Sequence, residues 1–413
     1  MNSELKYAEL PDGRRSSLTP MRILLHDFPG HPFPAQLSRE LASRGKIVLH
    51  AYCGTVTTGR GDVSTREGDP PSLRFIDVSN AKFERYNPLR RLESEVRYGR
   101  RLARLVTKFR PDVVVSNAPL VVQALLWRSA RRTGTRRVYW LQDFLGRGTR
   151  TVLSARSALL GASFGRAFEA LETRLLHQAD ALIVIADDFL DELKRRGVNT
   201  PTEVIENWAP VDELPTRDRY NAWSSRHALD DCVVALYSGT LGLKHDPEHL
   251  VRAAEALGTG QVLVVITEGT GREALERARA QRDLKNLVLL DYVPYDVLPD
   301  VLGAAEVCLV LLEPEAGTFS VPSKTLSYFA AGRAVVGAVP AENLAAKTVL
   351  RAGAGIIVEP GDYEGFASAV CNLLSDSQRT ASMGAAGRAY AEDRFDIAEI
   401  GDRFVDVIHA QAV

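Results

Sequence analysis

The chain has 413 residues, of which 45% are hydrophobic and 25% are charged, and its formal net charge is -1. This length suggests two domains, and the composition is typical of a folded globular protein and excludes a collagen-like or disordered chain. The near-zero charge argues against a nucleic-acid-binding protein, because such domains carry a basic excess.

The chain begins with residues 1–20, which lack the apolar region of a signal peptide and are predicted to be a flexible lead-in. No stretch approaches the roughly 18 uninterrupted apolar residues that span a bilayer. The four cysteines are far apart in the sequence and are interpreted as reduced core residues, neither metal ligands nor disulfide partners. Together these features predict a cytoplasmic protein.

From Met21 onward, short apolar runs alternate with longer amphipathic stretches, the pattern of βαβ units with a parallel sheet covered on both faces. Between the first two runs, Leu37 and Leu41 lie four residues apart on a predicted helix that stops at Gly45. We assign residues 21–207 to an N-terminal Rossmann-like domain. Its predicted strands are 21–26, 46–52, 72–78, 112–117, 137–142, 181–186 and 203–207.

Residues 208–222 contain prolines and charges without a clear period, which predicts a linker. A second series of strands and helices follows, and residues 223–395 are assigned to a C-terminal Rossmann-like domain. Its predicted strands are 232–239, 261–269, 286–293, 307–313, 334–339 and 355–360. Residues 396–413 form a helix that could cross back to the first domain. The predicted fold class is α/β, with two Rossmann-like parallel-sheet domains facing a central cleft.

The loops after the strands are where ligands bind in open parallel sheets. After strand 232–239 come Gly239, Thr240 and Lys244, just before a helix. Glycines let a backbone approach a ligand closely, and the lysine supplies a positive charge for a diphosphate. A tight turn with a solvated lysine explains the same residues equally well.

After strand 307–313, Ser320, Pro322, Ser323 and Lys324 lie where a helix should begin. Free N–H groups, hydroxyls and an ammonium would face an anion there. Helix capping alone explains the serines and the proline, but not Lys324, because a cation at a helix N-terminus opposes the macrodipole unless an anion offsets it.

Three further strand ends carry weaker signals. Gly269 and Gly271 form a G-x-G turn after strand 261–269, which is structural more often than functional. In the first domain, Gln142 and Asp143 follow a strand, and the loop HDFPGHPFP after the first strand offers His26, Asp27, Gly30 and His31, any of which could be a polar core residue or a loop cap.

In this order the motifs resemble the retaining glycosyltransferases of family 4, which have the GT-B fold, and especially the colanic-acid and O-antigen fucosaminyl transferases. The resemblance covers Met21 to about Phe395. It is carried by VYWLQDFLG, ADALIVIADDF, VIENWAPVDELP, LYSGTLGLKHDPEHL, SVPSKTLSYFAAGRAVV and GAGIIVEPGDYEGF.

The resemblance implies a nucleotide diphosphate sugar held by the C-terminal domain, a glycan or lipid-linked acceptor held by the N-terminal domain, no metal or other cofactor, and retention at the anomeric carbon. Lys244 would stabilise the leaving diphosphate, and the helix start after Pro322 would hold phosphate or sugar hydroxyls. Gly30 would face the donor from the opposite wall, and the turn at Tyr292 and Val293 would meet the base.

The chain departs from the family pattern at several positions. The family's two glutamates, eight positions apart, correspond to Phe319 and Ser327, and Glu313 or Glu315 could replace the first of them. Thr240 stands where the family often has an arginine. Gln142 replaces the family's first-domain histidine and is followed by the expected Asp143. These changes leave open an altered donor, altered contacts or weak activity.

Residues 88–110 set eight basic residues against Glu93 and Glu95, with apolar residues on a helical face. This segment could rest on anionic lipid at the inner face of the cell membrane, or could be a domain helix with a solvated basic side. The basic and apolar stretch 146–168 is a second candidate. Two other functions remain open: a non-hydrolysing sugar-nucleotide epimerase, and a nucleotide-sugar-binding subunit. The sequence identifies neither the donor sugar and its base, nor the acceptor, nor the oligomeric state.

Overall fold

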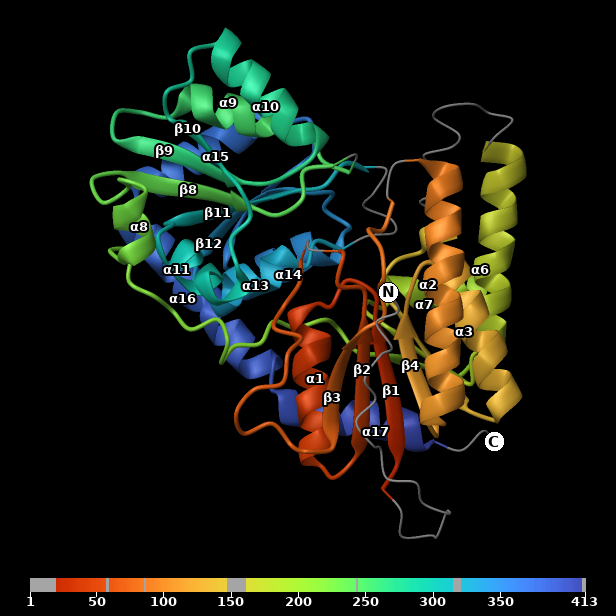
Figure 1. The fold of residues 1–413 in the computed structure, drawn as a ribbon. Coiled ribbons are helices and arrows are strands. Elements are labelled where there is room, and N and C mark those ends of the chain that lie inside the picture. Colours follow the sequence, from red (N-terminus) through yellow and green to blue (C-terminus); the bar gives the residue numbers. More distant parts are fainter. Residues whose placement is uncertain are drawn as a thin grey trace.

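The computed structural model describes residues 20–56, 59–84, 87–146, 161–242, 244–314 and 321–410. The predicted lead-in lies almost wholly outside these residues, as does most of the stretch 146–168. The described chain forms two α/β units that lie side by side, each built on one parallel sheet (Figure 1). The predicted fold class is therefore confirmed.

The first sheet has seven parallel strands in the order β3-β2-β1-β4-β5-β6-β7. The strands are β1 (Arg22–Asp27), β2 (Ile47–Tyr52), β3 (Leu73–Asp77), β4 (Val113–Asn117), β5 (Arg136–Leu141), β6 (Ala181–Val184) and β7 (Thr202–Val204). Central strands such as β4 and β6 are buried almost throughout. They are buried because helices cover both faces, which is why these strands consist of continuous apolar runs.

The helices of this unit divide between the two faces of the sheet. They are α1 (Pro32–Ser43), α2 (Pro88–Phe109), α3 (Leu120–Thr133), α6 (Arg166–Gln178), which follows a π-helical turn η1 (Gly161–Gly165), and α7 (Asp188–Arg195). Helices α2, α3 and α6 stand together on one face, and α1 lies on the other (Figure 1). Helix α1 ends at the predicted place, where Gly45 takes a left-handed φ of 77°.

The second sheet has six parallel strands in the order β10-β9-β8-β11-β12-β13. These are β8 (Val233–Ser238), β9 (Gln261–Ile266), β10 (Leu287–Leu290), β11 (Val307–Leu311), β12 (Ala334–Ala338) and β13 (Gly355–Val358). Its helices are α8 (Ala222–Arg226), α9 (Glu248–Ala256), α10 (Thr270–Gln281), the short η2 (Tyr295–Val297), α11 (Leu298–Gly303), α13 (Lys324–Ala330), α14 (Leu344–Ala352), α15 (Tyr363–Ser375) and α16 (Ser377–Arg394). Each of the thirteen predicted strands thus coincides with an observed strand.

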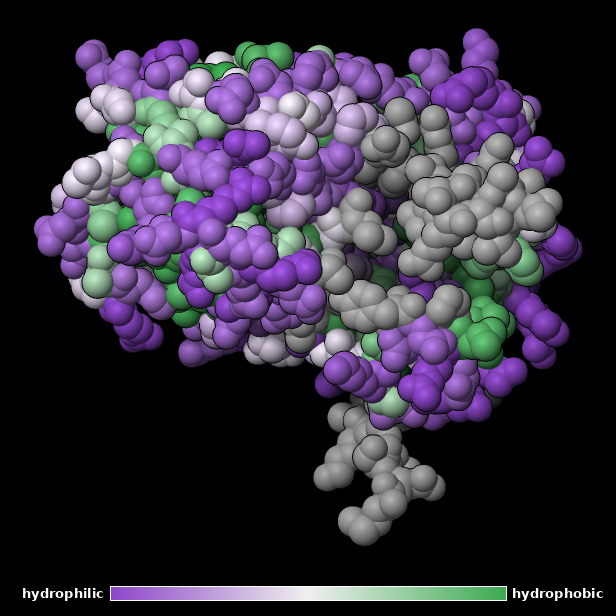
Figure 2. All heavy atoms as spheres, turned by 90° about the horizontal axis from the view of Figure 1, so that it is seen from above, coloured by the Kyte–Doolittle hydropathy of each residue, from purple (hydrophilic) through white to green (hydrophobic). Residues whose placement is uncertain are grey.

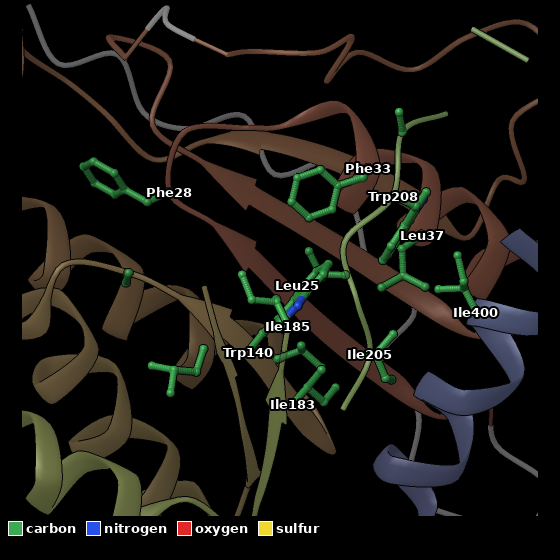
Figure 3. Close-up of a cluster of buried hydrophobic side chains, with 14 of the residues drawn as sticks. Leu25, Phe28, Phe33, Leu37, Trp140, Ile183, Ile185, Ile205, Trp208 and Ile400 are labelled. Atoms are coloured by element: carbon green, nitrogen blue, oxygen red, sulfur yellow. The ribbon is translucent and has the colours of Figure 1, made fainter. Parts of the chain in front are cut away.

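The chain ends in α17 (Ile397–His409), which lies against the first sheet although it follows the second one in sequence. Phe404 packs edge-on against Trp140, with ring centroids 4.9 Å apart, and Trp140 stacks on Trp208 at 5.8 Å. Figure 3 shows Trp140, Trp208, Phe33 and Ile400 within one hydrophobic cluster. Fully burying each such aromatic side chain contributes about 1.5–3 kcal/mol, so α17 is part of the first unit's core.

Candidate active site

In both sheets the strand order reverses at one point, between β1 and β4 in the first and between β8 and β11 in the second. Crevices at such points, outside the carboxyl ends of the strands, are where ligands bind in this class of fold. A pocket of about 450 Å³ lies between the two units. It is lined from the first unit by Phe28, Pro29, His31, Phe33, Asn117, Gln142, Asp143 and Asn207 among others, and from the second by Val321 and Ser323.

Two of the predicted residues meet across the cleft. The Nζ of Lys244, in the loop after β8, lies 3.8 Å from Oδ2 of Asp143, in the loop after β5, and both side chains are about one-third exposed (40% and 31%). The backbone carbonyl of Lys244 accepts a hydrogen bond from the N–H of Glu313 at 2.9 Å, which ties this loop to the end of β11. Lys244 is therefore positioned at the mouth of the cleft, with its charge turned toward the opposite unit.

Lys324 is the first residue of α13, so it lies at a helix start as predicted. Its Nζ is buried, lies 3.6 Å from the centroid of the Tyr237 ring, and has no hydrogen-bond partner among the described residues. The residue as a whole is half-buried. Burial lowers the pKa of Lys324 to about 7, because the charged form loses its hydration.

Both lysines influence the same imidazole. His245 is next to Lys244 in sequence, and the pKa of its imidazole falls to about 3 because of burial and the positive charges of Lys324 and Lys244. Both ammonium groups therefore act on one imidazole at the end of β8. The two cations that the sequence placed in separate loops therefore both lie within electrostatic range of His245.

Gly239 lies directly over the buried ammonium. A Cβ at Gly239 would be 2.9 Å from Nζ of Lys324, and the residue has a φ of 136°, which disfavours any other amino acid. Next to it, Thr240 accepts a hydrogen bond at Oγ1 from the Tyr292 hydroxyl at 3.2 Å. This bond connects the loop after β8 to the loop after β10, which also holds Val293. Three predicted donor-side residues therefore lie along one edge of the second sheet.

Gly269 lies at the start of α10 with a φ of 96°. The following Gly271 is in tight contact with Leu241, because a Cβ there would come within 2.5 Å of the Leu241 side chain and carbonyl. The G-x-G turn therefore has a clear structural cause, the close packing of α10 against the loop after β8.

The expected capping of α13 is wrong in detail. Helix α13 begins at Lys324, and Ser323 has a helical conformation with no hydrogen bond from its side chain to the helix. Pro322 contributes its carbonyl, which accepts from Thr325 N at 3.4 Å. Ser323 lines the pocket between the units. Glu315, Ser320 and Phe319 lie outside the described residues, and Ser327 is on the half-buried side of α13.

On the first-domain wall, Gln142 is paired with Asn207, 65 residues away. The Gln142 amide donates to Oδ1 of Asn207 at 3.1 Å, and the Asn207 amide donates back to Oε1 of Gln142 at 2.5 Å. Gly30 forms a tight turn with a φ of 77°. Its carbonyl accepts from Gly61 N at 2.8 Å, so the loop after β1 is fixed by backbone contacts.

Asp27 and His31 form a second pair on this wall, and from the sequence alone they could be identified only as loop residues. The Nδ1 of His31 lies 3.1 Å from both carboxylate oxygens of Asp27, whose side chain is 3% exposed. Although burial lowers it, the pKa of His31 is raised overall, because the Asp27 charge and hydrogen bond, and the Asp143 charge, favour the imidazolium. A spacing of four residues after a buried strand, Asp then His, is the only signal that the sequence carried.

Comparison with known proteins agrees with this geometry. Residues 31–208 match the family model of the glycosyl transferase 4-like domain, and residues 233–376 match that of glycosyl transferases group 1. The two sheets, the cleft between them and these matches define a glycosyltransferase with the GT-B fold. The chain belongs to the glycosyltransferases that combine these two domains.

Two relatives illustrate the similarity. The chain is 25% identical over 314 residues to WcaI of Escherichia coli, named as a colanic acid biosynthesis glycosyl transferase, and covers 74% of that protein and 73% of its own length. It is 25% identical over 300 residues to a GDP-mannose-dependent alpha-(1-6)-phosphatidylinositol monomannoside mannosyltransferase of Mycolicibacterium smegmatis, with 70% of this chain and 74% of that protein covered.

Solved structures share the fold across almost the whole chain. Sucrose-phosphate synthase from Thermosynechococcus elongatus superposes with a TM-score of 0.71 at 19% identity, covering 94% of this chain and 98% of that one. Anabaena HepE in complex with UDP-glucose superposes with a TM-score of 0.69 at 17% identity and the same coverage.

Proposed function

We propose that this glycosyltransferase takes its sugar from a nucleotide diphosphate donor whose diphosphate binds between Lys244 and Lys324. The observation that carries the proposal is the buried ammonium of Lys324, which has no acceptor among the described residues. A buried cation without a partner lowers stability. An anionic ligand would offset that cost, so retaining such a lysine is understandable in a site that binds an anion.

Positive charge would act on the diphosphate in two ways. It would hold the bound donor, and it would stabilise the diphosphate as a leaving group. Lys244 is partly exposed, and Lys324 lies beneath Gly239, where a missing side chain leaves room for close approach. Positive groups aimed at the developing charge stabilise the transition state. The two ammonium groups together fill this role without a metal ion, and transfer would therefore continue in the presence of a chelator.

The first-domain wall would hold the acceptor. Gln142, Asn207 and Asp143 offer amides and a carboxylate to sugar hydroxyls, and the mannosyltransferase of Mycolicibacterium smegmatis is named as acting on a phosphatidylinositol mannoside. We propose a glycan or a lipid-linked acceptor in cell-surface glycoconjugate synthesis. From the family resemblance we further propose retention at the anomeric carbon, which the configuration of the product would test.

Helix α2 supports contact with a membrane surface. Its Arg97, Arg100, Arg101 and Arg104 line a groove together with the exposed Leu89 and Leu92, which are 80% and 46% exposed. Seen from above, the molecule is largely hydrophilic, with hydrophobic residues in small separate patches over both units (Figure 2). No helix in the described part of the chain is long and apolar enough to cross a bilayer. We propose peripheral binding to anionic lipid at the inner face of the membrane.

The membrane proposal is tested with vesicles of phosphatidylcholine containing 30% phosphatidylglycerol. The wild-type protein should float with these vesicles and not with pure phosphatidylcholine. The double variant Arg100→Glu, Arg104→Glu should lose this binding, whereas Arg226→Glu, on α8 of the second unit, should keep it. Equal flotation of both variants would rule out α2 as the contact.

The donor proposal is tested with UDP-, GDP- and dTDP-sugars. We expect at least one to raise the melting temperature of the wild type and to be consumed, with release of the nucleotide diphosphate in the presence of an acceptor extract. Lys244→Ala should bind and turn over this donor poorly, whereas Lys285→Ala, an exposed lysine on a distant loop, should behave as the wild type. Epimer formation without acceptor would indicate an epimerase, and binding without turnover a nucleotide-sugar-binding subunit.

A further inference from the structure

Helices α3 and α6 lie side by side on one face of the first sheet and form a groove of about 410 Å³ (Figure 1). The floor of the groove is apolar and consists of Trp127, Leu171 and Leu175. Nε1 of Trp127 donates a hydrogen bond to the Leu175 carbonyl at 3.2 Å, which joins the two helices in the interior. The groove is therefore already formed, and a ligand would bind without first ordering it.

The sides of the groove are strongly basic, because four arginines line it: Arg128, Arg131 and Arg132 on α3, and Arg174 on α6. All four are exposed, and within the described part of the chain none of their guanidinium groups has a hydrogen bond or an ion pair. Helix α3 contains no carboxylate, and the buried Glu172 of α6 is bonded to Arg196 at 2.7 Å. The positive charge of the groove is therefore not offset by a paired carboxylate of the described chain.

Other exposed arginines of this protein are paired. On the second unit, Arg252 and Arg282 each donate a hydrogen bond at 2.9 Å to a glutamate of α9. The whole chain has 51 basic and 52 acidic residues, so carboxylates are not scarce. The helix dipole favours the two arginines in the last turn of α3. Arg128 and Arg174 lie before the last turns of their helices, so the dipole does not account for them.

We propose that this groove binds an acidic helix of a partner protein. Guanidinium groups bind carboxylates through two parallel hydrogen bonds, a geometry that an ammonium does not offer. Arg128, Arg131 and Arg132 are three and four residues apart, so they lie on one side of α3. Carboxylates on successive turns of a partner helix have the same spacing. A helix that lies in a groove between two others is a common mode of protein recognition.

A membrane surface is the other anionic partner to consider, and the groove fits it less well. Peripheral helices bury exposed apolar side chains in the lipid. Helix α2 offers Leu89 and Leu92, which are 80% and 46% exposed, whereas Trp127 and Leu175 in the groove are 1% and 2% exposed. Because α3 lies between α2 and α6, the lipid contact proposed for α2 leaves the groove available to a protein.

The test measures fluorescence anisotropy with the full chain and a labelled alanine-based helical peptide that carries glutamates three and four residues apart. At low salt the wild type should bind this peptide with a dissociation constant in the micromolar range, and a peptide with glutamines in their place should not bind. The double variant Arg128→Glu, Arg131→Glu should weaken binding by about tenfold or more, because two attractions become repulsions. The double variant Arg100→Glu, Arg104→Glu, on α2, changes the net charge equally and should bind as the wild type does.

A conservative variant guards against misfolding. Arg128→Lys, Arg131→Lys keeps the charge but loses the paired hydrogen bonds, so it should melt as the wild type does and bind the peptide about threefold more weakly. Undiminished binding by this variant and by the charge-reversed groove variant would overturn the proposal, as would the absence of any binding by the wild type.

Two further measurements distinguish the other occupants. If the charge-reversed groove variant no longer floats with vesicles of phosphatidylcholine and phosphatidylglycerol, the groove contacts lipid and the proposal is wrong. If the wild type sediments as a dimer and this variant as a monomer, the groove holds a second copy of the chain, and the proposal is again wrong. All these variants should bind the nucleotide sugar normally, so failure here leaves the proposed function intact.

Discussion

The two walls of the cleft differ in whether their polar side chains have hydrogen-bond partners within the protein. On the second-domain wall, the ammonium of Lys324 is buried without a hydrogen-bond partner among the described residues. On the first-domain wall, Asp27 is bonded to His31 and Gln142 to Asn207. One wall has positive charge in excess, and the other has its polar groups paired. The first arrangement suits an anionic ligand, and the second suits a neutral ligand rich in hydroxyls, which exchanges one hydrogen bond for another.

The largest expected effect comes from Lys244, the more exposed of the two lysines on the second-domain wall. Lys244→Ala should lower the turnover number by about 100- to 1,000-fold, the usual loss when a group that stabilises a leaving charge is removed. Its stability should change by less than about 0.5 kcal/mol, because partly exposed ion pairs such as Lys244 with Asp143 contribute little. Steady-state kinetics and chemical denaturation measure the two quantities. An unchanged turnover number would remove Lys244 from the reaction.

The buried lysine should show opposite changes in binding and stability. Lys324→Met should weaken the binding of the free nucleotide diphosphate by about 100-fold, as expected for loss of one partner of a desolvated charge pair. The same variant should melt at a higher temperature than the wild type without ligand, because it removes an unpaired buried charge. Calorimetric titration and thermal melting test this. A lower melting temperature together with unchanged affinity would mean that Lys324 is a structural residue.

The stability gain of Lys324→Met should depend on pH. The pKa of Lys324 is lowered from 10.5 to about 7, so between these values the unfolded chain binds the proton and the folded chain does not. Wild-type stability therefore rises with pH in this window. The gain of the variant should be greatest near pH 7 and should shrink toward pH 10. Melting curves across this range would show it, and a gain independent of pH would contradict the assigned burial.

A smaller effect is expected on the first-domain wall, where the polar groups are paired. Gln142→Leu leaves the Asn207 amide without its partner and removes one group that could meet the acceptor. Losing a hydrogen bond of this kind costs about 1 kcal/mol, so the catalytic efficiency toward the acceptor should fall by about fivefold. The affinity for the nucleotide diphosphate should stay the same. An equal loss of donor affinity would show that the donor and the acceptor are not bound by separate walls of the cleft.

The smallest effect is a pH-dependent stability difference at His31. Because Asp27 raises the pKa of His31, this pair stabilises the fold below the unfolded pKa of about 6.5, and the contribution is lost as the pH rises through the folded pKa. The melting temperature of His31→Gln should therefore be further below that of the wild type at pH 5.5 than at pH 9. A constant difference would show that the imidazole is neutral throughout.

The fold could be predicted from the sequence because strands buried on both faces consist of continuous apolar runs, such as VVV in β4 and LIV in β6. Strand-end loops then located Lys244, Asp143 and Gly239, since parallel strands bring their carboxyl ends to one edge. The pairing of Gln142 with Asn207 could not be predicted, because the two residues follow β5 and β7 and meet only through the order and register of β5, β6 and β7. The burial of Lys324 depends on the direction of one side chain, which periodicity does not determine.

The aromatic contact of α17 with Trp140 and Trp208 has a consequence for synthesis on the ribosome. The first sheet is translated well before Phe404, the residue of α17 that covers its tryptophans. Until then the nascent chain carries an open apolar surface, a natural binding place for chaperones. Emergence of α17, not completion of the first two hundred residues, would thus mark the moment at which this half of the enzyme becomes fully assembled.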